Sequence, residues 1–171
     1  MTGPLPEMLD LLRGLKRTAE RAVAQVPDDR LSVPLGPDEN SIAILMQHIS
    51  GNQRSRWTDF LTTDGEKPDR ARDTEFEDAG LPRVALLERW EEGWAVLFGA
   101  LEPLGPDDLD RIVRIREEPH TVSKAILRQI GHYAMHVGQI VQLARHHAGP
   151  EWKTLSIPRG RSDEFLRRPP G

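Results

Sequence analysis

The chain has 171 residues and contains no cysteine. This absence excludes disulfide bonds, thiolate metal ligands and a cysteine nucleophile. Any metal ion bound by the chain must therefore be held by nitrogen and oxygen atoms. Any thiol that takes part in a reaction must arrive with another molecule.

Long apolar runs are also missing, because charged residues make up 29% of the chain and interrupt every apolar stretch. No segment is therefore expected to span a membrane. The first residues, Met1 to Glu7, lack a basic region followed by an apolar run, so no signal peptide is expected. We expect a cytoplasmic protein without a membrane partner.

Basic residues are not in excess, since 23 Lys and Arg stand against 27 Asp and Glu, for a net charge of −4. A general nucleic-acid-binding protein usually carries a basic surface. The basic residues here are scattered except in the C-terminal tail. We therefore expect no nucleic-acid partner and rank a DNA-binding function below the alternatives that follow.

The length predicts a single domain over residues 1–171, with a core of about residues 5–150 and a tail over 151–171. Four segments place apolar residues three and four positions apart, which is typical of amphipathic helices. Four such helices predict an all-α protein built as a four-helix bundle. The predicted helices cover about 7–26, 41–61, 82–101 and, starting at Thr121 or Ser123, a last segment that ends at 147.

Three segments between and after these helices lack helical periodicity. The connection over 62–79 is polar and long for a compact domain, so we interpret it as a lid, a partly ordered crossover or a flexible loop. The segment before the last helix alternates weakly and predicts either a short β-hairpin or an extended loop. The last residues of the tail, which end in Arg167-Arg168-Pro169-Pro170, are expected to lack order.

Three histidines are candidate metal ligands. His132 and His136 lie four residues apart in the last predicted helix, and His48 lies in the second. Residues at i and i+4 share one face of a helix, so two imidazoles can bind one metal ion. Tyr133 stands where zinc hydrolases with an H-E-x-x-H motif have glutamate, so that motif is absent. The alternative is that the three histidines are half-buried, hydrogen-bonded side chains at the edges of the apolar helix faces.

The segments around these histidines resemble the DinB/YfiT-like superfamily of bacterial four-helix proteins. The resemblance rests on the residues 118–122, on the string 129–140 (QIGHYAMHVGQI) and on 46–52 (MQHISGN). The tail over 152–162 (WKTLSIPRGRS) is similar to an uncharacterised branch of that superfamily. The resemblance covers nearly the whole chain.

The resemblance implies an up-down-down-up bundle with a divalent metal, often nickel or zinc, bound by three histidines. Carried over by position, the ligands are His48, His132 and His136. Characterised members transfer low-molecular-weight thiols such as bacillithiol or mycothiol, or isomerise substrates with the help of a thiol. Many members are homodimers, so a homodimer is expected here.

The first functional hypothesis is a metal-dependent thiol S-transferase that acts on electrophiles, with the thiol as a cosubstrate. Asn52 lies one turn after His48, and Gln129 lies close to one turn before His132, so both are candidates to line the cleft. Arg159 and Arg161 in the tail are candidates to bind carboxylates of the thiol, because arginine suits bidentate carboxylate contacts. The alternative for these two arginines is a solvated loop.

Two other functions remain open. A metal-dependent hydrolase ranks lower, because no carboxylate shares the helix face of His132 and His136. The other is a non-catalytic, stress-related bundle with a structural or vestigial metal site. Four tryptophans could form a dimer face for such a protein, although Trp57, Trp90 and Trp94 fall on predicted core stripes.

Overall fold

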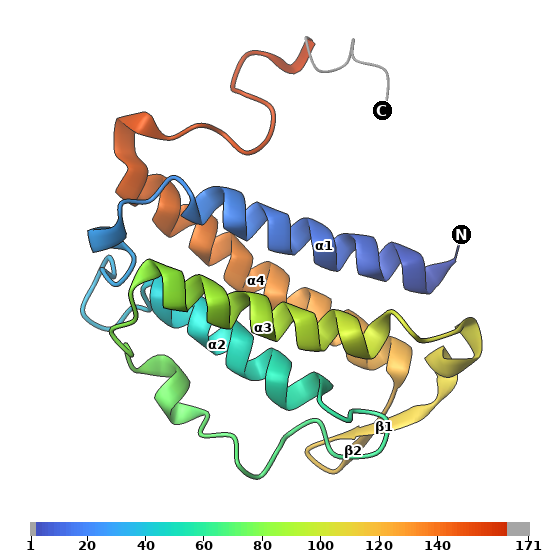
Figure 1. Cartoon of the computed structure of the whole chain (residues 1–171). Coiled ribbons are helices and arrows are strands. Elements are labelled where there is room, and N and C mark those ends of the chain that lie inside the picture. The colour runs from blue at the N-terminus through green and yellow to red at the C-terminus, as the bar shows by residue number, and fades with distance from the viewer. Residues whose placement is uncertain (1–2, 164–171) are drawn as a thin grey trace.

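A computed structural model describes residues 3–163 and confirms the all-α architecture with a hairpin before the last helix (Figure 1). The predicted lack of order at the end of the tail falls on 164–171, outside the described residues. No helix of the described part is long and apolar enough to cross a membrane. The main elements are α1 (Pro4–Val23), α2 (Ile42–Trp57), α3 (Arg83–Leu101), β1 (Ile112–Ile115), β2 (Glu118–Thr121) and α4 (Val122–Ala148).

The helix ends differ from the prediction by a few residues. Helix α1 begins at Pro4 rather than Glu7, because a proline in the first turn loses no intrahelical hydrogen bond. Helix α2 begins where predicted, since the Ser41 side chain accepts a hydrogen bond from the Ile44 amide at 3.2 Å. It ends at Trp57 rather than Leu61, and Asp59 then takes a positive φ of 48°.

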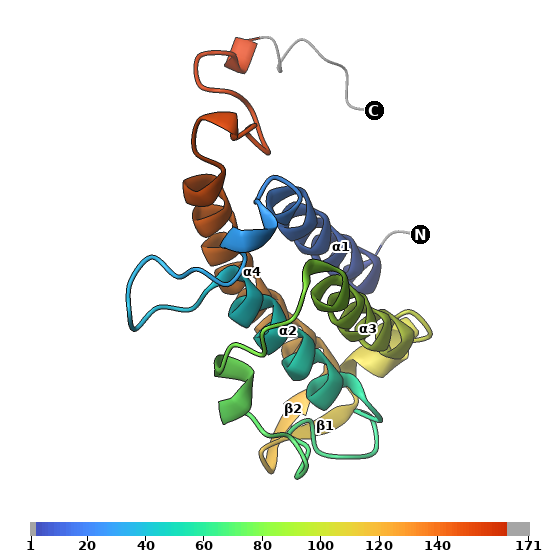
Figure 2. The same ribbon diagram turned by 60° about the vertical axis from the view of Figure 1, so that its left-hand side comes forward.

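The four helices are arranged up-down-down-up, as Figures 1 and 2 show from two sides. Helices α2 and α3 run in the same direction, and α1 and α4 both run in the opposite one. Because α2 and α3 are parallel, the chain between them must return along the whole bundle. The segment 58–82 makes this return, which explains the long polar connection: it is an ordered crossover that includes the short 3-10 helix Asp73–Phe76.

The core lies between the four helices and contains the large aromatic side chains. Trp57, Trp90 and Trp94 are almost fully buried, so these three do not form a dimer face. Trp57 Nε1 donates a hydrogen bond to the Tyr133 hydroxyl at 3.2 Å, and that hydroxyl donates to Asn52 Oδ1 at 3.1 Å. This chain of hydrogen bonds joins the middle of α2 to the middle of α4.

The β-hairpin has a two-residue turn in which both residues take a left-handed conformation. Arg116 has a φ of 55° and Glu117 a φ of 67°, which matches the turn type that suits the twist of a hairpin. The Asp64 carboxylate, which lies in the crossover, accepts hydrogen bonds from both of their backbone amides, at 2.8 and 2.7 Å. The crossover therefore fastens the tip of the hairpin to the end of the bundle.

Candidate metal centre

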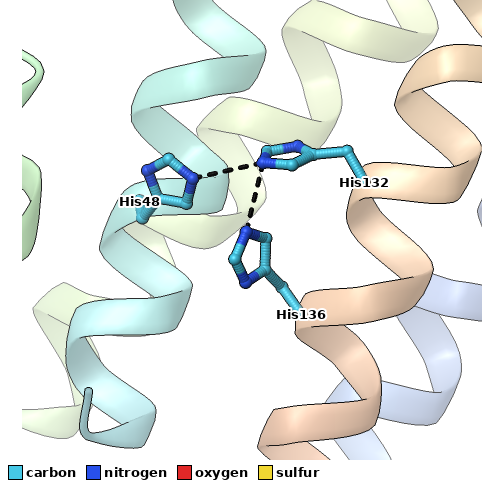
Figure 3. Close-up of side chains that lie close together, drawn as sticks. All are labelled: His48, His132 and His136. Carbon is cyan, nitrogen blue, oxygen red and sulfur yellow. Dashed lines mark hydrogen bonds between the residues drawn. The ribbon is translucent and has the colours of Figure 1, made fainter. Parts of the chain in front are cut away.

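The three histidines proposed as metal ligands come together between α2 and α4 (Figure 3). Nε2 of His132 lies 3.3 Å from Nε2 of His48 and 3.1 Å from Nε2 of His136. One nitrogen from each residue lies within 4.8 Å of the others. The antiparallel packing of α2 against α4 places His48 opposite the His132–His136 pair.

These separations fit a metal ion. Zinc binds imidazole nitrogen at about 2.0–2.1 Å, and tetrahedral angles then separate two ligand nitrogens by about 3.3–3.4 Å. The separations of His132 Nε2 from the Nε2 atoms of His136 and His48, 3.1 and 3.3 Å, are close to that value. Three histidines leave a tetrahedral ion with an open position, which is typical of catalytic rather than structural zinc sites.

The tautomers of two histidines also favour a metal. His48 Nδ1 donates a hydrogen bond to Glu75 Oε2 at 2.8 Å, and His136 Nδ1 donates to Gln139 Oε1 at 2.7 Å. A neutral imidazole that carries its proton on Nδ1 presents a lone pair at Nε2. Both lone pairs point toward His132 Nε2, and a cation between the three rings would bind all of them. A hydrogen-bonded Nδ1 behind a ligand is the usual support of a metal site. His48 and His136 have this support, whereas His132 Nδ1 has no hydrogen-bond partner among the described residues.

Glu75 belongs to the crossover and is held against α2 from two directions. Its carboxylate accepts two hydrogen bonds from Arg70, both at 2.7 Å, in addition to the one from His48. The Gln47 amide donates to the backbone carbonyls of Thr74, Glu75 and Glu77, which fixes this segment beside His48. The carboxylate is thus set by the fold rather than by the histidine alone.

Gly51 provides the space that the Glu75 carboxylate needs. A Cβ atom added to Gly51 would lie 2.7 Å from Glu75 Cδ, and still closer to Oε1. The carboxylate cannot easily move away, because Arg70 and His48 hold both of its oxygens. This explains a glycine in the middle of a helix, where it costs about 1 kcal/mol relative to alanine.

The electrostatics of the site favour a neutral His132, a neutral His136 and a charged Glu75. Burial, with His136 and His48 nearby, lowers the pKa of His132 to about 3, and burial also lowers the pKa of His136. Burial alone would raise the pKa of Glu75, but the hydrogen bonds from Arg70 and His48 outweigh it, so the net shift is downward. At neutral pH His132 and His136 therefore keep lone pairs available for a metal.

A cavity of about 210 Å³ is lined by two of the three histidines, His48 and His132, and is strongly basic. Asn52 and Gln129, the two residues expected to line a cleft, both line this cavity. Asn52 Oδ1 is occupied by Tyr133, which leaves its amide NH2 group for the cavity. The lining residues are His48, Asn52, Arg56, Arg70, Arg72, Arg116, Arg128, Gln129 and His132.

The structure does not bring Arg159 and Arg161 to this site. Both are exposed and lie in the tail beyond the end of α4 at Ala148. That end is about 18 Å along the helix axis from His136, at 1.5 Å per residue. Neither residue lines the cavity, and the sequence offered no periodicity that could have placed the tail.

The sequence did not predict several residues of the site, among them Glu75, Gln139, Arg56 and Arg128. For three of these four the sequence contains a pattern that could have indicated them. Arg56 follows His48 and Asn52 at four-residue spacing on α2, and Arg128 precedes His132 by four on α4. Gln139 lies three residues after His136. Glu75 carried no comparable signal, because it lies in a segment without periodicity.

The fold and the site define a class of protein: a four-helix bundle of the YfiT type with a three-histidine candidate metal site. YfiT from Bacillus subtilis, described as "a probable metal-dependent hydrolase with an unusual four-helix bundle topology", has a similar structure. The TM-score is 0.64 and the identity 18%, over 83% of this chain and 86% of that one, so the likeness concerns the fold. No curated protein matches the sequence.

The family follows from the sequence itself. The model of the family described as "Protein of unknown function (DUF1572)" matches residues 3–161. The chain therefore belongs to the DUF1572 family, which is DinB-like, as the resemblance indicated.

Proposed function

We propose that this protein is a divalent-metal-dependent S-transferase that joins a low-molecular-weight thiol, of the bacillithiol or mycothiol type, to an electrophile. The observation that carries the proposal is the convergence of three Nε2 atoms between α2 and α4 beside a basic cavity. His48, His132 and His136 would hold the metal, with zinc or nickel as the candidates. A divalent metal held there supplies positive charge that lowers the pKa of a thiol or a water molecule.

The composition of the cavity favours a thiol over water. Among the described residues no carboxylate lines the cavity, and Glu75 is already engaged by Arg70 and His48. A thiol of the cysteine type has a pKa of about 8.5 and needs little help to lose its proton. Water is a far weaker acid than a thiol, with a much higher pKa, and usually needs a base as well as a metal. The chain has no cysteine, so the thiol has to be a cosubstrate.

The first test is the metal content of the protein, purified without a histidine tag and measured by elemental analysis. We expect an equimolar amount of zinc or nickel in the parent and none in the His132→Ala/His136→Ala double variant. His146→Ala/His147→Ala, at the end of the same helix, is the matched control and should retain the metal. A parent that binds neither metal after incubation with both would refute the proposal.

The second test is thiol binding to protein loaded with nickel or cobalt, followed by absorption spectroscopy. We expect added thiol to produce a thiolate-to-metal charge-transfer band and to be consumed with an electrophile. The same mixture with the double variant should show neither effect. Thiols that leave the spectrum unchanged and undergo no turnover would contradict the transferase function while leaving the metal site in place.

The likeness to YfiT favours metal-dependent hydrolysis as a second candidate, because YfiT is described as a probable hydrolase of that kind. Ester and amide substrates offered without a thiol distinguish the two reactions. A third outcome is a purely structural metal, for which removal by a chelator would unfold the protein. We also propose, from the family resemblance, that the protein is a homodimer, which light scattering would test.

A further inference from the structure

Arg56 is a buried cation whose hydrogen-bonding groups are mostly unused. It lies on α2 two turns after His48, and only 3% of the residue is exposed. Within the described residues its Nε and Nη1 atoms have no hydrogen-bond partner. Its ion pair joins Nη2 to Glu66 Oε2 at 3.5 Å, which is long for a charged hydrogen bond. Burying a guanidinium in this way costs free energy unless its N–H groups find acceptors.

The surroundings of Arg56 show where those acceptors would come from. Arg56 lines the same cavity as His48 and His132, together with four more arginines. Glu66 and Glu75 form ion pairs with Arg70, and Glu66 also contacts Arg116, but no acid of the described residues lines the cavity itself. The cavity therefore presents an excess of positive charge next to the candidate metal ligands.

Gln129 is a second unsatisfied group at this cavity. It is 2% exposed, and its Oε1 atom has no hydrogen-bond donor within residues 3–163. Arg56 and Gln129 both line this cavity, so donors and an acceptor without partners among the described residues lie side by side at its wall. Groups of this kind are rare in folded proteins without a ligand or ordered water to satisfy them.

We propose that this cavity is an oxyanion-binding subsite, in which Arg56 binds a carboxylate or phosphate group of the substrate. Gln129 accepts a hydrogen bond from a hydroxyl or amide N–H of the same ligand. The planar guanidinium matches both anions because it can donate two parallel hydrogen bonds. The small volume, about 210 Å³, suits a small metabolite. The proposal rests on the proposed function for calling this ligand a substrate.

The test is calorimetric titration of the full chain with inorganic phosphate and, separately, with succinate, in metal-free and zinc-loaded protein. We expect at least one anion to bind, and Arg56→Gln to weaken its binding by about tenfold or more, which is the loss of one good charged hydrogen bond. Arg54→Gln, an exposed arginine on the same helix, is the matched control and should bind like the parent. The two anions decide between a phosphate and a carboxylate ligand.

The exposed residue Arg128 keeps the test decisive if Arg56→Gln does not fold, because Arg128→Gln should fold and still weaken binding. No binding of either anion to the parent, or parent-like binding by both variants, would overturn the subsite. Binding that needs zinc and is lost in His132→Ala would assign the anion to the metal and also overturn it. Anion binding that persists in a protein that takes up no metal would support the subsite and refute only the proposed function.

Discussion

Replacing Gly51 by alanine is expected to raise the helix propensity of α2 and, at the same time, to weaken metal binding. Alanine in the middle of α2 gains about 0.8–1.0 kcal/mol of helix propensity over glycine. The new Cβ would, however, lie 2.7 Å from Glu75 Cδ, so the carboxylate has to leave its place. It would then give up its hydrogen bond to His48 Nδ1, which is 2.8 Å long.

The loss of that hydrogen bond sets the expected magnitude. Removing a group that orients a metal-binding histidine typically weakens metal affinity by about 10- to 100-fold, which equals about 1.4–2.7 kcal/mol. We therefore expect Gly51→Ala to weaken zinc binding by this factor. Glu75→Gln, which keeps the size of the side chain but removes its charge, should weaken it in the same direction.

Competition with a chromophoric chelator measures the zinc affinity, and circular dichroism during denaturation measures stability. Gly14→Ala in α1 is the matched control, because a Cβ there meets nothing within 4 Å. It should raise the free energy of unfolding by about 1 kcal/mol and leave zinc affinity unchanged. If Gly51→Ala binds zinc as tightly as the parent, the reasoning that Glu75 positions His48 is wrong.

Three further predictions concern stability, each measured by denaturant unfolding. The pKa of Asp64 is lowered, since the hydrogen bonds from the backbone amides of Glu66, Glu117 and Arg116 outweigh the upward effect of burial. Its stabilisation is therefore complete above the unfolded-state pKa of about 3.9 and lost as the pH falls through the folded-state value. Asp64→Asn should lower stability at pH 7, by an amount that shrinks below about pH 4; a constant difference would contradict this. Gly93→Ala should destabilise by about 1–3 kcal/mol, because the added Cβ would lie 2.9 Å from Ser50 Cα where α2 and α3 pack. Gln53→Met should raise stability by about 1 kcal/mol, because both polar atoms of this buried amide lack partners within the described residues; a loss instead would indicate a bound water.

The helices and the candidate histidine ligands could be predicted from the sequence for a physical reason. Helical periodicity and helix caps such as Ser41 depend on neighbouring residues, so a single sequence is enough to recognise them. The four-residue spacing of His132 and His136 fixes their relative position on one helix. The direction of the four helices was supplied by the family resemblance. The length of the 62–79 connection was consistent with it, because parallel neighbours need a return segment.

Other parts of the site depend on contacts that no local pattern records. Glu75 reaches His48 only because the crossover passes over α2, and a polar segment without periodicity gives no sign of that path. Arg56 follows the His48 and Asn52 stripe, but an arginine at a helix end is typical of a solvated position, so its burial was not expected. Arg159 and Arg161 were proposed by chemistry alone, and the structure leaves them in an exposed tail.

The three ligands differ in how much folding each requires. His132 and His136 are paired as soon as α4 is helical, but His48 is 84 residues from His132 and joins them only when α2 docks against α4. Before α2 docks against α4, the chain can therefore offer a metal ion only the two histidines of α4. Binding by all three histidines requires the complete tertiary structure. A metal bound this way favours the native state by RT ln(1 + [L]/Kd), about 2.7 kcal/mol when the free metal is about 100 times Kd. The concentration of free metal would then determine how strongly α2 is held against α4.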